Sequence, residues 1–324
     1  MKKYLPLLLR LLGPALLLIF LINADLGKLW ATLLGAHLWP ILLSLLLMPP
    51  FVMIKSWRWL RLLREMGIDL KFSTASALYT VGLFYGATTP GQAGDLLKAV
   101  YLRERGHPLP PAMLSVVLDR LFDLLIMAAL GALGIFALGR LLPSRELQTA
   151  LVILMGVGLV VLTVFLVARG PRQWALTVAI PRLAPGLTAT LERWNNQLRT
   201  LTLSPQLLAA VSIASLISAS FTFYRLWLLF AALDLNLVPL YVVVGASALI
   251  AVLQVLPISI AGVGVRDTVL IAVLLPYGYS TEQALTLSAL FLLLNLQHIL
   301  VGFIVSFWFP LGRTNATVPS ADQG

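Results

Sequence analysis

Thr88-Thr89-Pro90-Gly91-Gln92-Ala93-Gly94-Asp95 breaks an apolar region that runs from residue 74 to residue 102. A second apolar region, 238–275, is broken in the same way from Pro257 through Gly264. Proline cannot donate a backbone hydrogen bond and glycine permits tight turns, so a helix that enters either region ends near its middle. Two crossings of a bilayer take about 40 helical residues, which neither region comfortably supplies. Each region therefore crosses once or forms a re-entrant hairpin.

The rest of the chain is typical of an all-α membrane protein. Of its 324 residues, 60% are hydrophobic and 11% are charged, whereas soluble domains are about 45–50% apolar and about 25% charged. Six further segments reach the length of about 20 residues that a crossing needs. These segments are 5–22, 37–54, 111–138, 149–168, 207–233 and 282–309. The first has no signal-peptide cleavage site, so we interpret it as a retained span. Residues 1–310 form one membrane domain in this interpretation, and 311–324 form a disordered cytoplasmic tail.

The distribution of lysine and arginine favours hairpins over single crossings. With both hairpins re-entrant, 16 of the 23 basic residues face the cytoplasm and three face the opposite side. Single crossings would move Arg103, Arg105 and the arginines of 169–199 outside, against the positive-inside rule. Irregular backbone at membrane depth is tolerated only inside protein or beside water, so the hairpins should face the protein interior. We predict six spans plus two re-entrant hairpins in the cytoplasmic (inner) membrane, with both termini in the cytoplasm.

The two hairpins lie at matching places in the chain. Arg58 precedes Pro90 by 32 residues, and Arg225 precedes Pro257 by the same interval. In the predicted topology the hairpin of the first half, about 1–138, enters from the cytoplasm, and that of the second half, about 149–310, enters from outside. Inverted repeats with broken helices near the midplane are the architecture of secondary transporters, where half-helix ends bind the charged part of a substrate. The sequence therefore favours a transporter-like protein.

The four basic residues that remain, Lys98, Arg120, Arg225 and Arg266, lie at membrane depth. A charge at the centre of a membrane helix costs about 2.5–3.5 kcal/mol, so it must pair or face water. Two compatible interpretations stay open: these charges neutralise nearby acids and staple the hairpin, or they line a substrate path. The candidate substrate-binding residues are those of the two turns and the charges beside them: Pro90, Gly91, Gly94, Asp95, Lys98, Asp119, Arg120, Arg225, Pro257, Gly262, Gly264, Arg266 and Asp267.

Local spacing gives these residues expected contacts. Asp95 and Lys98 are three apart on the returning half-helix, where such residues can pair. This half-helix is expected to begin near Ala93, and the free N–H groups of its positive end are suited to an anion such as phosphate. Arg58 follows a predicted span, so we expect it to reach the cytoplasmic interface. His298, like the two other histidines, has no metal-ligand spacing, and we predict neither a metal nor a cofactor.

Several function classes are excluded on residue types. The net charge of +10 comes from basic residues spread between apolar segments, which argues against nucleic acid as a partner. Cysteine is absent from the sequence, which excludes thiolate chemistry and cysteine metal sites. Lys98 and Arg105 fit the Lys-x6-Arg opening of membrane lipid phosphatases, but the histidine elements of that family are missing, so no covalent route to phosphate release exists. We therefore expect no enzyme activity.

Motifs over nearly the whole chain resemble a known family. They are Gly82-Leu83-Phe84, Pro90-Gly91 with Gly94-Asp95 and Lys98-Ala99, Ser115-Val116 with Asp119-Arg120, and Pro257 with Ser259-Ile260-Ala261-Gly262-Val263-Gly264 and Arg266-Asp267. With these motifs the chain resembles the lysylphosphatidylglycerol synthase transmembrane-region family of flippase-like proteins. The resemblance implies movement of a lipid with a charged or glycosylated headgroup between leaflets. Full-length synthases also carry a soluble aminoacyl transferase domain, and this chain ends shortly after its last predicted span, so we expect the synthase reaction to be absent.

Two hypotheses follow from these observations. The first is a flippase-like lipid translocator that holds the headgroup with basic side chains while the acyl chains stay in the bilayer. The second is a lipid-binding or scaffold subunit of a membrane lipid or glycolipid biosynthesis complex, which does not transport. The family resemblance leaves the lipid open among phospholipids, hopanoids and polyprenyl-linked glycolipids, and a homo-oligomer or biosynthetic partner is compatible with either hypothesis. A polar cavity between the hairpins favours the first, and a space filled by side chains favours the second.

Overall fold

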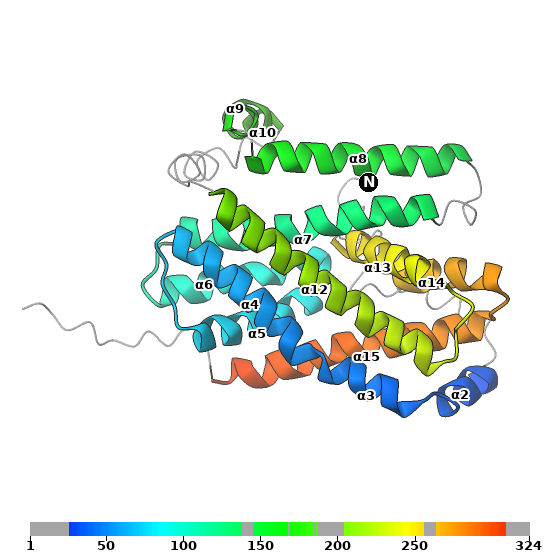
Figure 1. Cartoon of the computed structure of the whole chain (residues 1–324). Helices are drawn as coiled ribbons and strands as arrows, with labels where there is room; N and C mark the ends of the chain where they lie inside the picture. The colour runs from blue at the N-terminus through cyan, green and yellow to red at the C-terminus, as the bar shows by residue number, and fades with distance from the viewer. Residues whose placement is uncertain are drawn as a thin grey trace, which may run out of the picture.

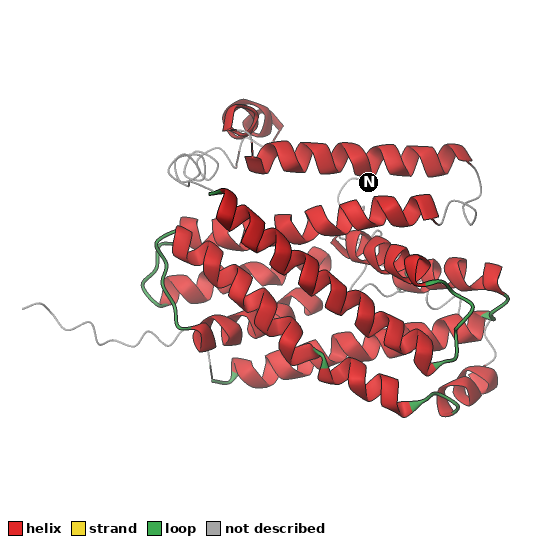
Figure 2. Ribbon diagram, in the orientation of Figure 1, coloured by secondary structure: helices red, strands yellow, loops and turns green. Residues whose placement is uncertain are grey.

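The structure, a computed structural model, describes residues 26–137, 145–167, 169–183, 186, 204–255 and 264–308. All regular elements in these ranges are helices (Figure 2). Three helical stretches there are long and apolar enough to cross a membrane. They are Leu38–Glu65, which α3 (Leu38–Leu46) and α4 (Met48–Glu65) form together, α12 (Pro205–Ala232) and α15 (Thr281–Ser306). The predicted all-α membrane class is confirmed.

The other elements are shorter or lie between these three stretches (Figure 1). In chain order they are α2 (Leu26–Leu34), α5 (Phe72–Thr88), the 3-10 helix η1 (Pro90–Leu96), α6 (Leu97–Glu104), α7 (Leu109–Ala137), α8 (Arg145–Val167), α9 (Arg169–Trp174), the π-helical turn η3 (Ala175–Ala179), α10 (Ile180–Leu183), α13 (Leu240–Val255), α14 (Val265–Leu274) and the 3-10 turn η5 (Leu275–Tyr277). Five predicted spans fall on described helices. The segments 5–22, 256–263 and 309–324, which include Pro257 and Gly262, lie outside the described residues.

Helix boundaries repeat along the chain with the interval found in the sequence. Arg58 and Arg225 are 167 positions apart. The helical stretch Pro205–Ala232 likewise begins and ends 167 positions after the stretch Leu38–Glu65. Each half has its own hydrophobic core: one cluster is built on α4 to α7, and another mainly on α12 to α15. The two halves therefore share a long helical stretch of the same length, and each packs a hydrophobic core of its own.

The matching long helices run in opposite directions. Ser44 in α3 donates a hydrogen bond to the carbonyl of Arg225 near the end of α12. Arg58, further along in α4, donates to Ser215, which comes earlier in α12. In Figure 1, α5 and α13 approach the centre of the molecule from opposite ends, and the turn η1 packs against α13. This is the relation that an inverted repeat requires.

The first hairpin is held closed by glycine contacts. A Cβ on Gly94 would lie 2.2 Å from the carbonyl oxygen of Tyr85, so only glycine lets the turn approach α5 this closely. Gly82 of α5 leaves space for side chains instead: a Cβ there would lie 2.6 Å from Asp95 Oδ1 and 2.6 Å from Lys98 Cδ. At Gly302 in α15 a Cβ would lie 2.5 Å from the carbonyl oxygen of Thr80. Gly94 and Gly302 thus let η1 and α15 approach the backbone of α5.

Candidate functional site

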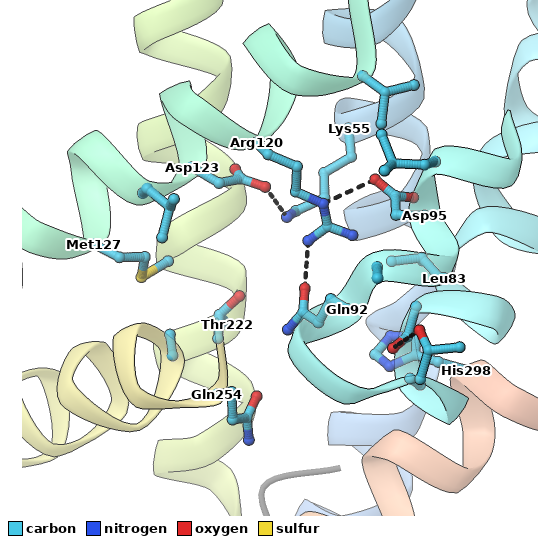
Figure 3. A pocket seen from close by; sticks show the side chains of 18 of the residues that line it. Lys55, Leu83, Gln92, Asp95, Arg120, Asp123, Met127, Thr222, Gln254 and His298 are labelled. Atoms are coloured by element: carbon cyan, nitrogen blue, oxygen red, sulfur yellow. Dashed lines mark hydrogen bonds and ion pairs between the residues drawn. The ribbon is translucent and has the colours of Figure 1, made fainter. Parts of the chain in front are cut away.

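A cavity of about 390 Å³ lies where the two halves meet (Figure 3). Its walls come from α4, α5, η1 and α7 of the first half and from α12, α13 and α15 of the second. Many wall residues are apolar, such as Leu83, Val117 and Met127. Its polar wall residues are Lys55, Thr89, Gln92, Asp95, Arg120, Asp123, Thr222, Gln254, Asn295 and His298. The cavity thus combines apolar walls with a group of charges on one side.

Two cations face this cavity, each bonded to an acid that also lines it. Lys55 Nζ donates to Asp123 Oδ2 at 2.7 Å. Arg120 Nε donates to Asp95 Oδ2 at 2.8 Å, and its Nη1 donates to Gln92 Oε1 at 2.5 Å. The side chain of Arg120 is 27% exposed and that of Lys55 is 12% exposed. Figure 3 shows both cations directed into the same space between α7 and the η1 turn.

Behind the cavity wall, three fully buried charges connect these two pairs. Arg58 Nη1 bonds Asp123, and its Nη2 lies 2.7 Å from Asp119 Oδ1. Lys98 Nζ lies 3.9 Å from Asp119 Oδ2 and 2.9 Å from Asp95 Oδ2. The charges therefore form one ion-pair chain of alternating sign: Lys55, Asp123, Arg58, Asp119, Lys98, Asp95 and Arg120.

Aromatic rings and hydroxyl groups surround the buried central members of the ion-pair chain. Lys98 Nζ lies 4.1 Å from the ring centre of Tyr79 and 5.0 Å from that of Trp59. Tyr79 donates its hydroxyl to Asp119 Oδ2 at 3.1 Å. Ser215 accepts from Arg58 Nη1 at 2.8 Å. Removing one member of a buried ion pair costs about 3–5 kcal/mol, because its partner stays buried and uncompensated. These contacts therefore fix the positions of the outer charges.

The turn of the first hairpin differs from the sequence expectation. The predicted half-helix near Ala93 is wrong, because residues 90–96 form the 3-10 helix η1 and the α-helix begins only at Leu97. The N–H groups of the turn are also less free than expected: that of Gly94 donates to Thr89 Oγ1 at 2.7 Å, and that of Gln92 to the Thr89 carbonyl at 3.2 Å. Gln92 has a φ of 56°, a strained value outside glycine. In this conformation the amide oxygen of Gln92 accepts the hydrogen bond from Arg120 Nη1.

In the second hairpin the predicted charges bind each other and α15. Arg266 Nε donates to Ser288 Oγ at 2.6 Å, and its Nη2 lies 3.4 Å from Asp267 Oδ1. Asp267 Oδ2 accepts from the N–H of Gly264 at 2.6 Å, which caps α14. Gly264 itself has a φ of 82°, in the region that favours glycine. These residues fix the returning arm of the second hairpin and are not part of the cavity wall described above.

Arg225 is buried against neutral acceptors. Its Nε donates to the carbonyl of Ser44 at 2.8 Å, and its Nη2 donates to Gln297 Oε1 at 2.9 Å. Its Nη1 lies 3.3 Å from Nε2 of His298, which lines the cavity. Arg225 therefore approaches the cavity through His298 rather than lining it.

The structure brings together part of the predicted site and adds residues to it. Of the candidate residues, Asp95 and Arg120 line the cavity, and Lys98 and Asp119 lie directly behind them. The expected pairing of Asp95 with Lys98 is observed at 2.9 Å. The prediction that Arg58 reaches the interface is wrong, because α4 continues to Glu65 and the Arg58 side chain is fully buried.

Of the ten polar residues of the cavity wall, sequence reasoning placed only Asp95 and Arg120 in the candidate site and missed the other eight. Lys55 and Asp123 were assigned no binding role, although they stand at one end of the ion-pair chain. His298 carries no spacing signal, and Gln254 stands just before the break of the second hairpin. Within the described ranges no group of three or more His, Asp or Glu side chains is arranged to hold a metal ion.

The fold and the site define a helical membrane protein with a charged cavity between two similarly built halves. Comparison with protein families identifies which one: residues 7–302 match the family model described as Lysylphosphatidylglycerol synthase TM region. The chain belongs to this family, which points to a function related to membrane lipids. No curated protein matches the chain.

Proposed function

We propose that this protein is a flippase-like translocator, which moves a lipid with a charged or glycosylated headgroup across the cytoplasmic membrane. The observation that carries the proposal is the cavity of about 390 Å³ between the two halves, with Lys55 and Arg120 on its wall. Cavities of this size hold small ligands, typically with mostly apolar walls and a few polar groups that fix orientation. A headgroup crossing the bilayer needs such a polar space, because exposing it to hydrocarbon is costly.

The proposed membrane arrangement follows from helix lengths. At 1.5 Å per residue, the 17 residues of α5 reach only about 25 Å. The hydrocarbon core is about 30 Å thick, so α5 falls short of a crossing. We propose that α5–η1–α6 and α13–α14 are the two re-entrant hairpins and that six further segments cross, with both termini in the cytoplasm. The positive-inside count supports this orientation.

The charged residues have distinct roles in this proposal. Arg120 and Lys55 contact the headgroup from the cavity wall. Asp95 and Asp123 hold these two cations, and the buried members of the ion-pair chain hold the acids in turn. Arg225, Arg266 and Asp267 keep the second half in position. No chemical conversion of the lipid is part of the proposal.

A second candidate function is a lipid-binding or scaffold subunit that does not transport. The observation that favours it is the extent of charge pairing, because each acid of the ion-pair chain contacts two bases. Such pairing also fits a protein whose charges only staple its helices. The cavity favours translocation over this candidate, since a staple needs no space beside it.

A leaflet-resolved lipid assay in proteoliposomes separates the two. The purified protein is reconstituted into vesicles that carry headgroup-labelled lipid, and an impermeant quencher reports the fraction in the outer leaflet. Translocation predicts faster exchange between leaflets than in protein-free vesicles and slower exchange with Arg120→Gln. Arg61→Gln, an exposed arginine of the same α4 as Lys55, serves as the control and should exchange at the wild-type rate. Exchange no faster than in protein-free vesicles contradicts the proposal and favours the scaffold.

A further inference from the structure

The ion-pair chain of Lys55, Asp123, Arg58, Asp119, Lys98, Asp95 and Arg120 does not balance its own charge. It contains four bases and three acids, in strict alternation, so it begins and ends with a base. Every acid lies between two bases, whereas each terminal base has one acid. The chain therefore carries one surplus positive charge, which belongs to its two ends.

The two terminal bases of the ion-pair chain line the same cavity. Lys55 and Arg120 are wall residues, whereas the three central members Arg58, Asp119 and Lys98 are fully buried behind the wall. Figure 3 shows the Lys55 ammonium and the Arg120 guanidinium directed into one space. The chain is thus bent, with its centre inside the protein and its two positive ends side by side at the cavity.

The described residues around the ion-pair chain add net positive charge. Arg225, behind His298, is bonded to uncharged groups, and Arg266 is matched by Asp267. Among the described residues that line the cavity, the only acids are Asp95 and Asp123, and both already bind its cations. The unpartnered Asp95 Oδ1 lies against Gly82 of α5, since a Cβ there would meet it at 2.6 Å.

An uncompensated charge in a low-dielectric site is costly, so the site should hold a counter-charge when it is occupied. The geometry points to a monoanionic phosphodiester, the phosphate of an anionic phospholipid headgroup, as the group bound between Lys55 and Arg120. A guanidinium and an ammonium are the two side chains that most often bind phosphate oxygens. The inference rests on the proposed function and names the class of its substrate: a lipid with a net negative headgroup rather than a zwitterionic or cationic one.

The neighbouring polar groups suit the rest of such a headgroup. Thr222, Gln254 and Asn295 line the same cavity from α12, α13 and α15 of the second half. Their amide and hydroxyl groups donate and accept hydrogen bonds without adding charge. They match the hydroxyls of a glycerol or sugar headgroup, whereas a headgroup ammonium would find no free carboxylate among the described wall residues.

Binding of short-chain lipids to the full-length protein in neutral detergent tests this inference. The probes are dihexanoyl phosphatidylglycerol, which is anionic, dihexanoyl phosphatidylcholine, which is zwitterionic, and dihexanoyl lysyl-phosphatidylglycerol, which is cationic. Competition against a fluorescent phosphatidylglycerol gives their relative affinities. We expect the anionic lipid to bind at least about tenfold more tightly than the other two, as one charge-assisted hydrogen bond accounts for that ratio. Equal affinities for the three lipids overturn the inference.

Variants and the free headgroup locate the site. Arg120→Gln keeps the length and the hydrogen bonding of the side chain but removes its charge, and it should abolish the preference for the anionic lipid. Arg61→Gln removes an exposed charge of α4 and should leave the preference intact. A preference that survives Arg120→Gln overturns the assignment. Free glycerophosphoglycerol is the water-soluble headgroup without acyl chains. If it competes as well as the lipid, the phosphodiester site is supported, but the assignment of its ligand to a membrane lipid is overturned.

The binding test and the flipping assay fail independently. If the protein prefers the anionic lipid but does not flip it, the inference stands and the proposed function is refuted. If the protein flips anionic, zwitterionic and cationic lipids at equal rates, the proposed function stands and the inference is refuted.

Discussion

Gly82→Ala is expected to destabilise the protein through the ion-pair chain, although alanine is the better helix former. A Cβ at position 82 would lie 2.6 Å from Asp95 Oδ1, 2.6 Å from Lys98 Cδ and 2.7 Å from its Cγ. Real Cβ atoms do not approach other atoms this closely, so Asp95 and Lys98 must move. Lys98 is fully buried and Asp95 is 2% exposed, which leaves neither side chain a free path.

The size of the effect follows from three contributions. Overpacking a close contact costs about 1–3 kcal/mol, and weakening one charge-assisted hydrogen bond costs about 1.5–3 kcal/mol. The helix preference of alanine over glycine returns about 1 kcal/mol. The expected net loss in the free energy of unfolding is therefore about 1.5–5 kcal/mol.

A second glycine provides the control. Gly156 lies in α8, where a Cβ would have no atom within 4 Å. Gly156→Ala should therefore leave the free energy of unfolding unchanged or raise it by up to about 1 kcal/mol. Both variants are measured by reversible denaturation in mixed micelles and compared with the wild type. If Gly82→Ala is as stable as Gly156→Ala, the close packing of Asp95 and Lys98 against α5 is refuted.

Two further predictions concern the stability of the site. Asp119→Ala should lower the free energy of unfolding by about 3–5 kcal/mol because Arg58 stays buried and loses its main partner. The double variant Arg58→Met/Asp119→Leu should recover much of this loss. A double variant as unstable as Asp119→Ala contradicts the argument. Gly94→Ala, whose Cβ would lie 2.2 Å from the Tyr85 carbonyl oxygen, should prevent recovery of monodisperse protein. Thr89→Val removes the hydroxyl that bonds Gly94 and Tyr85, and this variant should still fold, with a loss of about 1–3 kcal/mol in the free energy of unfolding. Size-exclusion profiles and unfolding curves distinguish the two outcomes.

The fold class and the first hairpin were readable from sequence because their signals are local. Pro90 and Gly94 mark the turn within a few residues, and the pairing of Asp95 with Lys98 depends on a spacing of three. The interval of 167 positions between the two long helical stretches was readable because Arg58 and Arg225, which lie in these stretches, are the same distance apart. None of these signals needs knowledge of how distant helices pack.

The cavity was not readable because its walls come from seven separate elements. Lys55 and Arg58 resemble the basic flank that follows a span, and the acids that bind them lie more than sixty positions away in α7. The composition of α4, in which polar and apolar residues balance, gives no sign that Arg58 is buried. His298 enters the site only through the packing of α15 beside α12. Such contacts depend on tertiary structure, which local patterns do not encode.

The central claim is that a lipid headgroup crosses the membrane through the cavity between the two halves. The absence of cysteine from the sequence allows a single thiol to be placed in that cavity by Thr222→Cys and another on the outer face of α8 by Ile153→Cys, where the native side chain is 59% exposed. Each variant is reconstituted, and lipid exchange between leaflets is measured before and after modification with a bulky maleimide, with full modification verified by intact mass. The account predicts that modification at position 222 stops exchange and that modification at position 153 does not. Exchange at the unmodified rate with a fully modified thiol at position 222 would contradict it.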